Sequence, residues 1–512
     1  MRKQNGVGVA RKPVKLTALL DAFCASVECW SHMRLMILLG GAAAVVILGW
    51  LLGRRYADRL AARALLRHRA RVDRFKLANR RHVRAALLAD PVIAEAVREH
   101  ARETSQSEAS AWRRASGYVN EIVPFFNVIA YFQIGLRVAR TVLNLFYKVS
   151  VEFEDRAALQ KLPKNAVLIY LMNHRSNADY VLVGFALSGQ VAISYAVGEW
   201  ARAFPLEHLF KAFGAYFVRR RYRERLYHTV LERYVQLITR QGVTQGIFLE
   251  GGLTRDGKLR PPKIGLFDYV IGIAREREYL QRLFVVPVAV NYDRVLEDRS
   301  LLLELARQEG KARPSRLSQL ADVTRFLIWN VVRLVTRQWK RYGRAAVVVG
   351  DAIPLEPWFR SNPDLFTLPR TERLAKVQSL SDQVMERIGS LIPVTPVALT
   401  CAAIQSFDSD HITREALLER MEEMRSALIE VNSRVLRADG DIRETFDRAW
   451  RMLHMRRVLA ESGNSYAVLS RGRPLISYYA NSIAHLLGPF ERAVRARDAL
   501  PALRFGEAPA LL

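Results

Sequence analysis

The chain is poor in cysteine. Its 512 residues contain three cysteines, Cys24, Cys29 and Cys401. Three thiols at such irregular positions cannot build a disulfide framework or a four-ligand zinc site, and reduced thiols are the expected state. We therefore expect the soluble part of the protein to lie in the cytoplasm.

Several catalytic motifs are missing as well. The sequence has no Gly-x-Ser-x-Gly elbow, no His-Glu-x-x-His helix and no Cys-x-x-Cys pair. These absences exclude the common serine-hydrolase and zinc-enzyme interpretations. Residues 252–258 have the Gly-x4-Gly-Lys spacing of a phosphate-binding loop, but Leu259 stands where a magnesium-binding hydroxyl is required. Nucleotide hydrolysis is not expected, and neither a metal nor a cofactor is implied.

Acidic residues are few relative to basic ones. The chain has 50 Asp and Glu against 78 Lys and Arg, for a net charge of +28. Such an excess predicts an anionic partner, which could be nucleic acid, a membrane surface or a phosphate-bearing substrate. The sequence shows no basic groove interleaved with aromatic residues, which disfavours nucleic acid. Half of the residues are apolar, enough for a substantial core.

One long apolar run is present near the N-terminus. Residues 35–53 carry no charge, with Trp30 and Trp50 at the two ends and Arg54 and Arg55 after them. This length and flanking pattern predict a transmembrane helix rather than a cleaved signal peptide, which would need small residues at its far end. Basic residues are denser after the run, so we expect the C-terminal portion on the cytoplasmic side of the cell inner membrane.

A second apolar region is shorter. Within residues 122–147 the charge-free run ends at residue 136; it is interrupted by Pro124, Asn127 and Gln133, and Arg137 and Arg140 follow it. The region fits a helix at the membrane interface or packed on the catalytic domain, and a buried core helix remains an equal alternative.

Short apolar segments alternate with helical ones from residue 166 onwards. This alternation predicts an α/β domain with a mainly parallel sheet flanked by helices, and sites beyond the carboxyl ends of strands. The expected divisions are a basic arm (1–34), a transmembrane helix (35–53), a helical region (54–150), the α/β domain (151–392) and a helical C-terminal region (393–512). The expected strands are 166–171, 191–197, 215–219, 246–250, 284–290 and 346–349.

A histidine and an aspartate follow the first of these strands. His174 and Asp179 have the spacing of a general base and the carboxylate that orients it. Imidazole titrates near neutrality, so His174 suits removal of a proton from a substrate hydroxyl. The alternative is a turn histidine followed by an aspartate that caps the next helix.

Three further blocks follow the next strands. Arg219 and Arg220 close one strand, and Arg255 follows a pair of glycines; guanidinium groups suit a phosphate, although Arg219 and Arg220 also begin a longer basic run that could be a solvated surface. Glu250 could bind acceptor hydroxyls or brace its loop through backbone hydrogen bonds. Pro287, in a Val-Pro-Val block, is expected to shape the site rather than to take part in the chemistry.

Together these blocks resemble the membrane-bound glycerol-3-phosphate acyltransferase family. The likeness spans residues 161–349, and residues 393–399 resemble a segment that follows the catalytic domain in long bacterial and mitochondrial members. Departures are modest: Asn177 and Ala178 replace bulkier residues, Leu253 stands where many members have Arg, and Thr254 replaces Ser. The resemblance implies the catalytic residues His174 and Asp179, and these substrate-binding residues: Arg219, Arg220, Glu250, Gly251, Gly252, Thr254, Arg255 and Pro287.

The resemblance also implies a reaction. An acyl group would move from acyl-CoA or acyl-carrier protein to the sn-1 hydroxyl of glycerol-3-phosphate, giving lysophosphatidate for phospholipid synthesis at a membrane lipid surface. Lysophosphatidate or dihydroxyacetone phosphate as acceptor is the alternative, because Leu253 replaces an Arg. A non-catalytic basic protein that binds membrane or nucleic acid is a second alternative, from the charge alone.

Overall fold

The computed structural model describes residues 80–125, 135–188, 191, 193–198, 206–219, 222–308, 341–488 and 490. All of these belong to one compact unit, His68–Leu512. The predicted transmembrane segment, residues 35–53, and the side chain of Arg220 lie outside the described residues. Within the described ranges, no helix combines the length and the apolar character that crossing a membrane requires.

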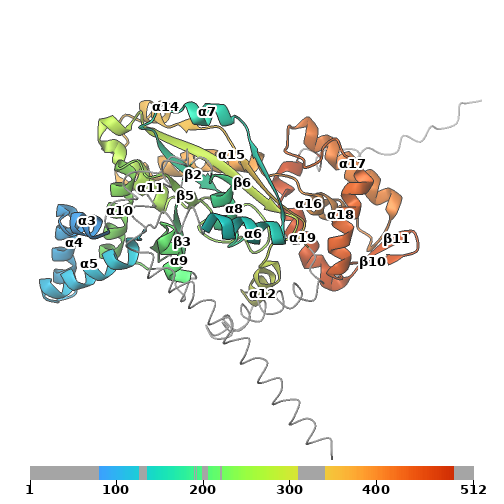
Figure 1. The fold of residues 1–512 in the computed structure, drawn as a ribbon, viewed down its shortest axis with the longest axis horizontal. Helices are drawn as coiled ribbons and strands as arrows, with labels where there is room; N and C mark the ends of the chain where they lie inside the picture. The colour runs from blue at the N-terminus through green and yellow to red at the C-terminus, as the bar shows by residue number, and fades with distance from the viewer. Residues whose placement is uncertain are drawn as a thin grey trace, which may run out of the picture. The chain divides into compact units, whose positions relative to one another are not determined.

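An eight-stranded mixed sheet forms the centre of the unit (Figure 1). Its order is β1-β7-β6-β2-β5-β3-β4, with β8 paired to β6. The described pairs are parallel, apart from β6 with β7 and β6 with β8, so the mainly parallel sheet predicted from the sequence is confirmed. The strands are β1 (Lys148–Phe153), β2 (Val167–Met172), β3 (Ser194–Gly198), β4 (Tyr216–Val218), β5 (Gln245–Phe248), β6 (Leu283–Tyr292), β7 (Arg344–Val349) and β8 (Ile353–Pro354).

Strand β2 lies in the middle of this sheet. All six of its residues are buried, and it pairs with β6 on one side and β5 on the other. A continuous apolar run of this kind is typical of a parallel strand covered on both faces. Because β2 ends at Met172, the next residues emerge at the carboxyl edge of the sheet, where His174 lies.

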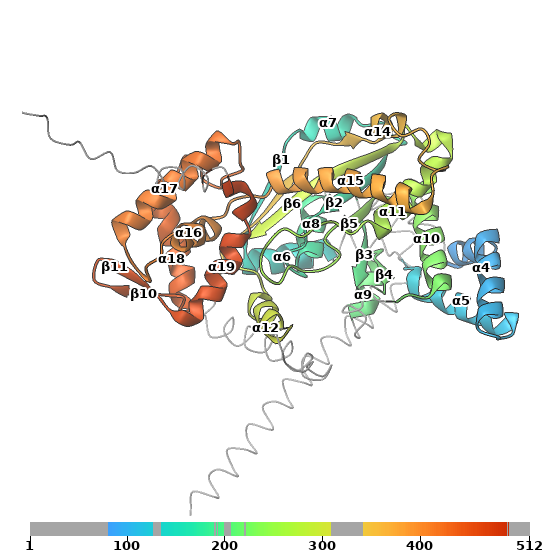
Figure 2. The same cartoon turned by 180° about the vertical axis from the view of Figure 1, so that it is seen from behind.

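Helices cover both faces of the sheet. Helices α6 (Leu136–Phe146) and α8 (Asp179–Ala186) pack together on one face, and α15 (Arg370–Ser390) runs along the other against β6 and β2 (Figures 1 and 2). Helix α10 (Arg225–Arg240) packs against α4 (Pro91–Glu103) and α5 (Glu108–Ile122). The other described α-helices before the C-terminal region are α3 (Arg80–Leu88), α7 (Arg156–Lys161), α9 (Leu206–Ala212), α11 (Gly265–Ile271), α12 (Asp298–Gln308) and α14 (Glu356–Arg360).

Helix α6 is the described end of the second apolar region. It packs on α8 and β1, with Leu143 buried and Val138 and Val142 exposed. Residues 126–134, the centre of that apolar region, lie outside the described residues.

The C-terminal region is mostly helical but not entirely so. Helix α16 (Pro396–Gln405) is almost wholly buried, and α17 (Arg414–Glu430), α18 (Ile442–Met455) and α19 (Arg473–Asn481) pack around it. An antiparallel sheet of β9 (His411–Thr413), β10 (Leu459–Ser462) and β11 (Ser465–Val468) completes it. The sequence predicted a mostly helical region, without these short strands. Strands of three or four residues are too short for a visible apolar alternation.

Candidate active site

His174 and Asp179 meet in a tight turn after β2. Nδ1 of His174 lies 2.9 Å from Oδ2 of Asp179, and the two side chains are 1% and 0% exposed. Asp179 is the first residue of α8, and the capping position before it is Ala178, which makes no side-chain cap. The aspartate therefore orients the histidine and does not cap the helix.

Four donors surround the Asp179 carboxylate. Besides the His174 ring, its Oδ2 accepts the backbone N–H groups of Arg175 at 2.7 Å and Ser176 at 3.0 Å. Its Oδ1 accepts the hydroxyl of Tyr292, at the end of β6, at 2.5 Å. Burial raises the pKa of Tyr292 well above its ordinary value, so this phenol stays a donor. These bonds stabilise the negative charge and fix the position of both oxygens.

Aromatic rings hold the His174 imidazole. It stacks on Phe248 with ring centroids 4.0 Å apart. It meets the ring of Tyr180 edge to face, with centroids 5.5 Å apart and an interplanar angle of 87°. With its plane fixed and Nδ1–H donated to Asp179, the basic atom of the imidazole is Nε2. This is the tautomer that a general base requires.

Glu250 braces the backbone at the same edge. Its Oε1 accepts the N–H of His174 at 2.8 Å, and its Oε2 accepts the N–H of Arg260 at 3.3 Å. Burial raises the pKa of Glu250 to about 7, opposed by the charge of Arg175 and by these hydrogen bonds. Of the two roles open from the sequence, the described contacts are those of a brace. The next residue, Gly251, has φ +64°, and a Cβ there would lie 2.7 Å from Lys263.

A second carboxylate holds the middle of the turn. Glu297 accepts the hydroxyl of Ser176 at 2.7 Å and the N–H of Asn177 at 3.1 Å. Sequence reasoning missed both Glu297 and Tyr292. Polar residues at the carboxyl end of the buried strand that contains Pro287 could have marked Tyr292, because parallel strands present their site residues there.

The described residues contain no group of three or more His, Cys, Asp or Glu side chains that could hold a metal ion. The site is a buried imidazole with a fixed tautomer at the edge of a sheet. Such a group can accept a proton from a substrate hydroxyl without a metal ligand set of its own.

Two family models match different parts of the chain. Residues 153–291 match the acyltransferase model, and this range includes His174, Asp179 and the three blocks that follow them. Residues 328–489 match the glycerol-3-phosphate acyltransferase C-terminal region. Over these residues the chain is similar to the glycerol-3-phosphate acyltransferase family. The resemblance inferred from the sequence blocks is confirmed by these matches.

Curated relatives in this family are longer than the chain. The glycerol-3-phosphate acyltransferase of Actinobacillus succinogenes is 29% identical over 432 residues, which cover 80% of this chain and 50% of the relative. That of Pasteurella multocida is 28% identical over 429 residues with the same coverage. The chain thus spans about half the length of these relatives.

A solved structure is also similar. It is the 1-acyl-sn-glycerophosphate acyltransferase of Thermotoga maritima, which matches 50% of this chain and 79% of its own chain at 16% identity, with a TM-score of 0.29.

Two of the arginines expected to bind phosphate, Arg219 and Arg255, have protein partners. Arg219 donates to Glu121 of α5 with Nε to Oε1 at 2.8 Å, and its guanidinium lies over the rings of Tyr118, Tyr222 and Tyr227. Arg255 pairs with Glu304 of α12 at 2.9 Å. The described ion pairs of Arg219 and Arg255 are thus made with carboxylates of α5 and α12.

The remaining predicted residues shape the loop and strand next to the pair. The hydroxyl of Thr254 lies 2.8 Å from the carbonyl oxygen of Lys258, and its backbone N–H reaches the carbonyl of His174 at 3.4 Å. Pro287 is buried in β6 opposite Leu171 of β2. Gly252 follows Gly251 in the turn after β5.

Proposed function

We propose that the chain transfers an acyl group from acyl-CoA or acyl-carrier protein to the sn-1 hydroxyl of glycerol-3-phosphate. The observation that carries this proposal is the buried His174–Asp179 pair, with Nδ1 and Oδ2 2.9 Å apart. The similarity to this family supports the substrate class, because the two curated relatives described above are named glycerol-3-phosphate acyltransferase.

The reaction needs one base that later acts as an acid. Nε2 of His174 takes the hydroxyl proton while the acceptor oxygen attacks the thioester carbon. Asp179 stabilises the imidazolium that forms. When the tetrahedral intermediate collapses, the carbon–sulfur bond breaks, and the imidazolium returns the proton to the sulfur that leaves. No cofactor enters this sequence.

Arg255 is the better of the two described arginines for the acceptor phosphate. Its ion pair with Glu304 is partly exposed, with side chains 27% and 49% accessible. Breaking this ion pair therefore costs little free energy. Arg219, by contrast, makes two bonds to Glu121, whose side chain is 9% exposed, and its guanidinium lies over three tyrosine rings. We assign Arg219 to the support of α5 and Arg255 to the phosphate.

Kinetics on three acceptors test the chemistry and the acceptor together. We expect His174→Ala to lower kcat by about 10² to 10⁴, the usual effect of losing a general base, while His411→Ala, at an exposed histidine of β9, keeps full activity. We expect kcat/KM to be highest for glycerol-3-phosphate when it is compared with dihydroxyacetone phosphate and lysophosphatidate.

Two results would contradict these expectations separately. A folded His174→Ala protein with normal turnover would reject the mechanism. A higher kcat/KM for lysophosphatidate would reject only the acceptor.

Arg255→Ala should raise KM for glycerol-3-phosphate, with kcat/KM down by about tenfold or more, since a charge-assisted contact contributes about 1.5 to 3 kcal/mol. Glu304→Gln should leave kcat/KM at least as high as in the parent protein, because it releases Arg255.

The proposed place of action is the cytoplasmic face of the inner membrane. The support is the uncharged run of residues 35–53 and the arginines that follow it. The full chain should therefore sediment with membranes and resist carbonate extraction, and removal of residues 1–55 should weaken attachment. Recovery of the full chain in the soluble fraction would overturn this placement.

A further inference from the structure

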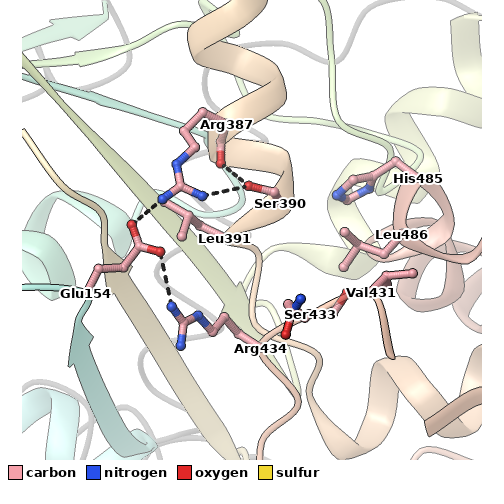
Figure 3. A pocket seen from close by; sticks show the side chains of 10 residues that line it. Glu154, Arg387, Ser390, Leu391, Val431, Ser433, Arg434, His485 and Leu486 are labelled. Carbon is pink, nitrogen blue, oxygen red and sulfur yellow. Dashed lines mark hydrogen bonds and ion pairs between the residues drawn. The ribbon is translucent and has the colours of Figure 1, made fainter. Parts of the chain in front are cut away.

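A pocket of about 390 Å³ lies where the end of α15 meets the C-terminal region (Figure 3). Its two guanidinium groups, on Arg387 of α15 and Arg434 of the C-terminal region, both bond the carboxylate of Glu154. Across the pocket, Nε2 of His485 lies 3.0 Å from the carbonyl oxygen of Gly389. Both guanidinium groups are thus paired within the protein. These contacts join the C-terminal region to β1 and α15.

Helix α19 of the same region meets the loop that carries Arg255. Nδ2 of Asn481, the last residue of α19, donates to the carbonyl oxygen of Asp256 at 2.8 Å. Gly257 follows with φ +82°, and a Cβ at this position would collide with the carbonyl of Tyr478. Because no side chain fits there, the backbone of the loop lies directly against the backbone of α19.

The loop is also tied to the catalytic turn. The N–H of Thr254 reaches the carbonyl oxygen of His174 at 3.4 Å, and the buried guanidinium of Arg175 donates to the carbonyl of Gly257. The same guanidinium donates to the carbonyl of Ser482, at the end of α19, at 3.1 Å. One buried cation therefore links the catalytic turn, the loop and the end of α19.

Arg255 lies between two anchored residues of this loop. The residue before it, Thr254, bonds the catalytic turn, and the residue after it, Asp256, bonds Asn481. With both neighbours held, the backbone of Arg255 has a fixed place relative to His174. A long side chain that starts from a fixed backbone loses less conformational freedom when its guanidinium binds a phosphate, so its binding is tighter.

The helix that Asn481 ends does not account for this residue. Asparagine is a weak helix former, and at helix ends it is favoured at the position with positive φ. Asn481 is instead the last helical residue, and Ser482 after it has φ −64°. The described hydrogen bond of the Asn481 side chain is the one to the loop.

We propose that Asn481 is a positioning residue for the acceptor phosphate and acts through Asp256 and Arg255. The C-terminal region then sets the affinity for a phosphate-bearing acceptor, and it does so through binding and not through the acyl transfer step. This inference rests on the proposed phosphate role of Arg255. It extends that role to a residue 225 positions from Asp256 in the chain.

Steady-state kinetics of the full chain in detergent test the proposal. The acceptor is the one of the three with the highest kcat/KM in the parent protein, since each carries a phosphate monoester. Asn481→Ala should raise KM for this acceptor by about fivefold and change kcat by less than about twofold, because one neutral hydrogen bond is lost and the base is untouched.

A double-mutant cycle asks whether this effect passes through Arg255. In the Arg255→Ala background, Asn481→Ala should change kcat/KM by less than about twofold, because the side chain that it positions is gone. A residue that only stabilises the fold would have the same effect in both backgrounds.

The matched control is Asn362→Ala. Asn362 lies just after α14, and its Nδ2 also donates to a backbone carbonyl, that of Trp358, at 2.9 Å. The control therefore loses the same kind of hydrogen bond in another element, and it should keep the parent KM and kcat.

The contrary outcomes are distinct. An unchanged KM in Asn481→Ala, or a fivefold effect that persists in the Arg255→Ala background, would overturn the inference alone. If Arg255→Ala itself keeps the parent KM, the proposed phosphate role of Arg255 is wrong and the inference is overturned with it.

Melting temperatures are measured on the same samples. If Asn481→Ala does not unfold in a single transition, Asn481→Leu replaces it, because leucine has the same branching and no hydrogen-bond donor. It should raise KM by a similar factor, and the parent KM in this variant would again overturn the proposal.

Discussion

Single residues of the turn after β2 have separate tasks. Asp179 holds the imidazole, Glu250 holds the backbone of His174, and Glu297 holds Ser176 and Asn177. A buried carboxylate is costly unless donors surround it, and all three accept hydrogen bonds from the turn or the loops beside it. We infer that the turn is rigid because three carboxylates fix it from different sides.

Glu250 makes stability depend on pH. Its pKa is raised by burial from 4.5 to about 7, so the folded state binds its proton more tightly than the unfolded chain does. The contribution of protonated Glu250 to the free energy of unfolding is complete below about pH 4.5 and is lost as the pH rises through 7. The loss is about 3 kcal/mol, from 2.5 pKa units at about 1.4 kcal/mol each.

Replacement by glutamine removes this titration. The melting temperature of the parent protein should fall between pH 5 and 8 relative to Glu250→Gln, which has nothing to ionise. The amide still offers an oxygen to the N–H of His174. Thermal unfolding of both proteins across this range is the measurement, and parallel curves would refute a raised pKa.

At the scale of elements, β6 connects the site to the rest of the fold. Asn291 donates to the carbonyl of Pro393 at 3.0 Å, and the next residue, Tyr292, donates to Asp179 at 2.5 Å. Neighbouring strand residues point to opposite faces, so one strand end serves both the C-terminal region and the catalytic pair. The register of β6 therefore positions both of these hydrogen bonds.

Tyr292→Phe should slow the reaction without unfolding the protein. Loss of the hydroxyl takes one donor from Asp179, which makes the carboxylate more basic and stabilises the imidazolium. The acid limb of the kcat/KM profile should then move to higher pH. The kcat should fall by about tenfold, because Asp179 loses the bond that fixes its Oδ1 and holds the imidazole in place less well. The control is Tyr147→Phe, because Tyr147 packs on Tyr292 but donates to the carbonyl of Arg294. An identical pH profile in both variants would exclude a positioning role for Tyr292.

On the scale of the whole described unit, the C-terminal region and the catalytic turn are tied by buried charge. Arg175, 1% exposed, donates to the carbonyls of Gly257 and Ser482. Asp298 bonds Arg456 and the hydroxyl of Tyr479, and it directly follows Glu297, which holds the turn. The C-terminal region therefore supports the active site as a structural partner.

Breaking the Asp298–Arg456 pair should destabilise the unit as a whole. The two side chains are each 3% exposed, so Asp298→Asn leaves a buried guanidinium without its countercharge. We expect a loss of about 3 to 5 kcal/mol and a single transition at a lower melting temperature. Asp410→Asn breaks an exposed pair with Arg473 and should cost under about 1 kcal/mol. Equal melting temperatures for these two variants would show that the buried pair does not join the regions.

Local patterns in the sequence determined much of this protein. The apolar run of β2, the alternation of strands and helices and the spacing of His174 and Asp179 are all written within short windows, because backbone periodicity and turn geometry are local. They predicted the mainly parallel sheet and placed the pair at its edge.

Tertiary structure alone decided which distant groups meet. Tyr292 is 113 residues from Asp179, and Glu121 is 98 residues from the arginine it neutralises, Arg219. A charge in the sequence does not reveal its partner, so the carboxylates beside Arg219 and Arg255 could not be predicted. Such pairings depend on how the elements pack, since contacts between segments far apart in the chain leave no periodic trace in either one.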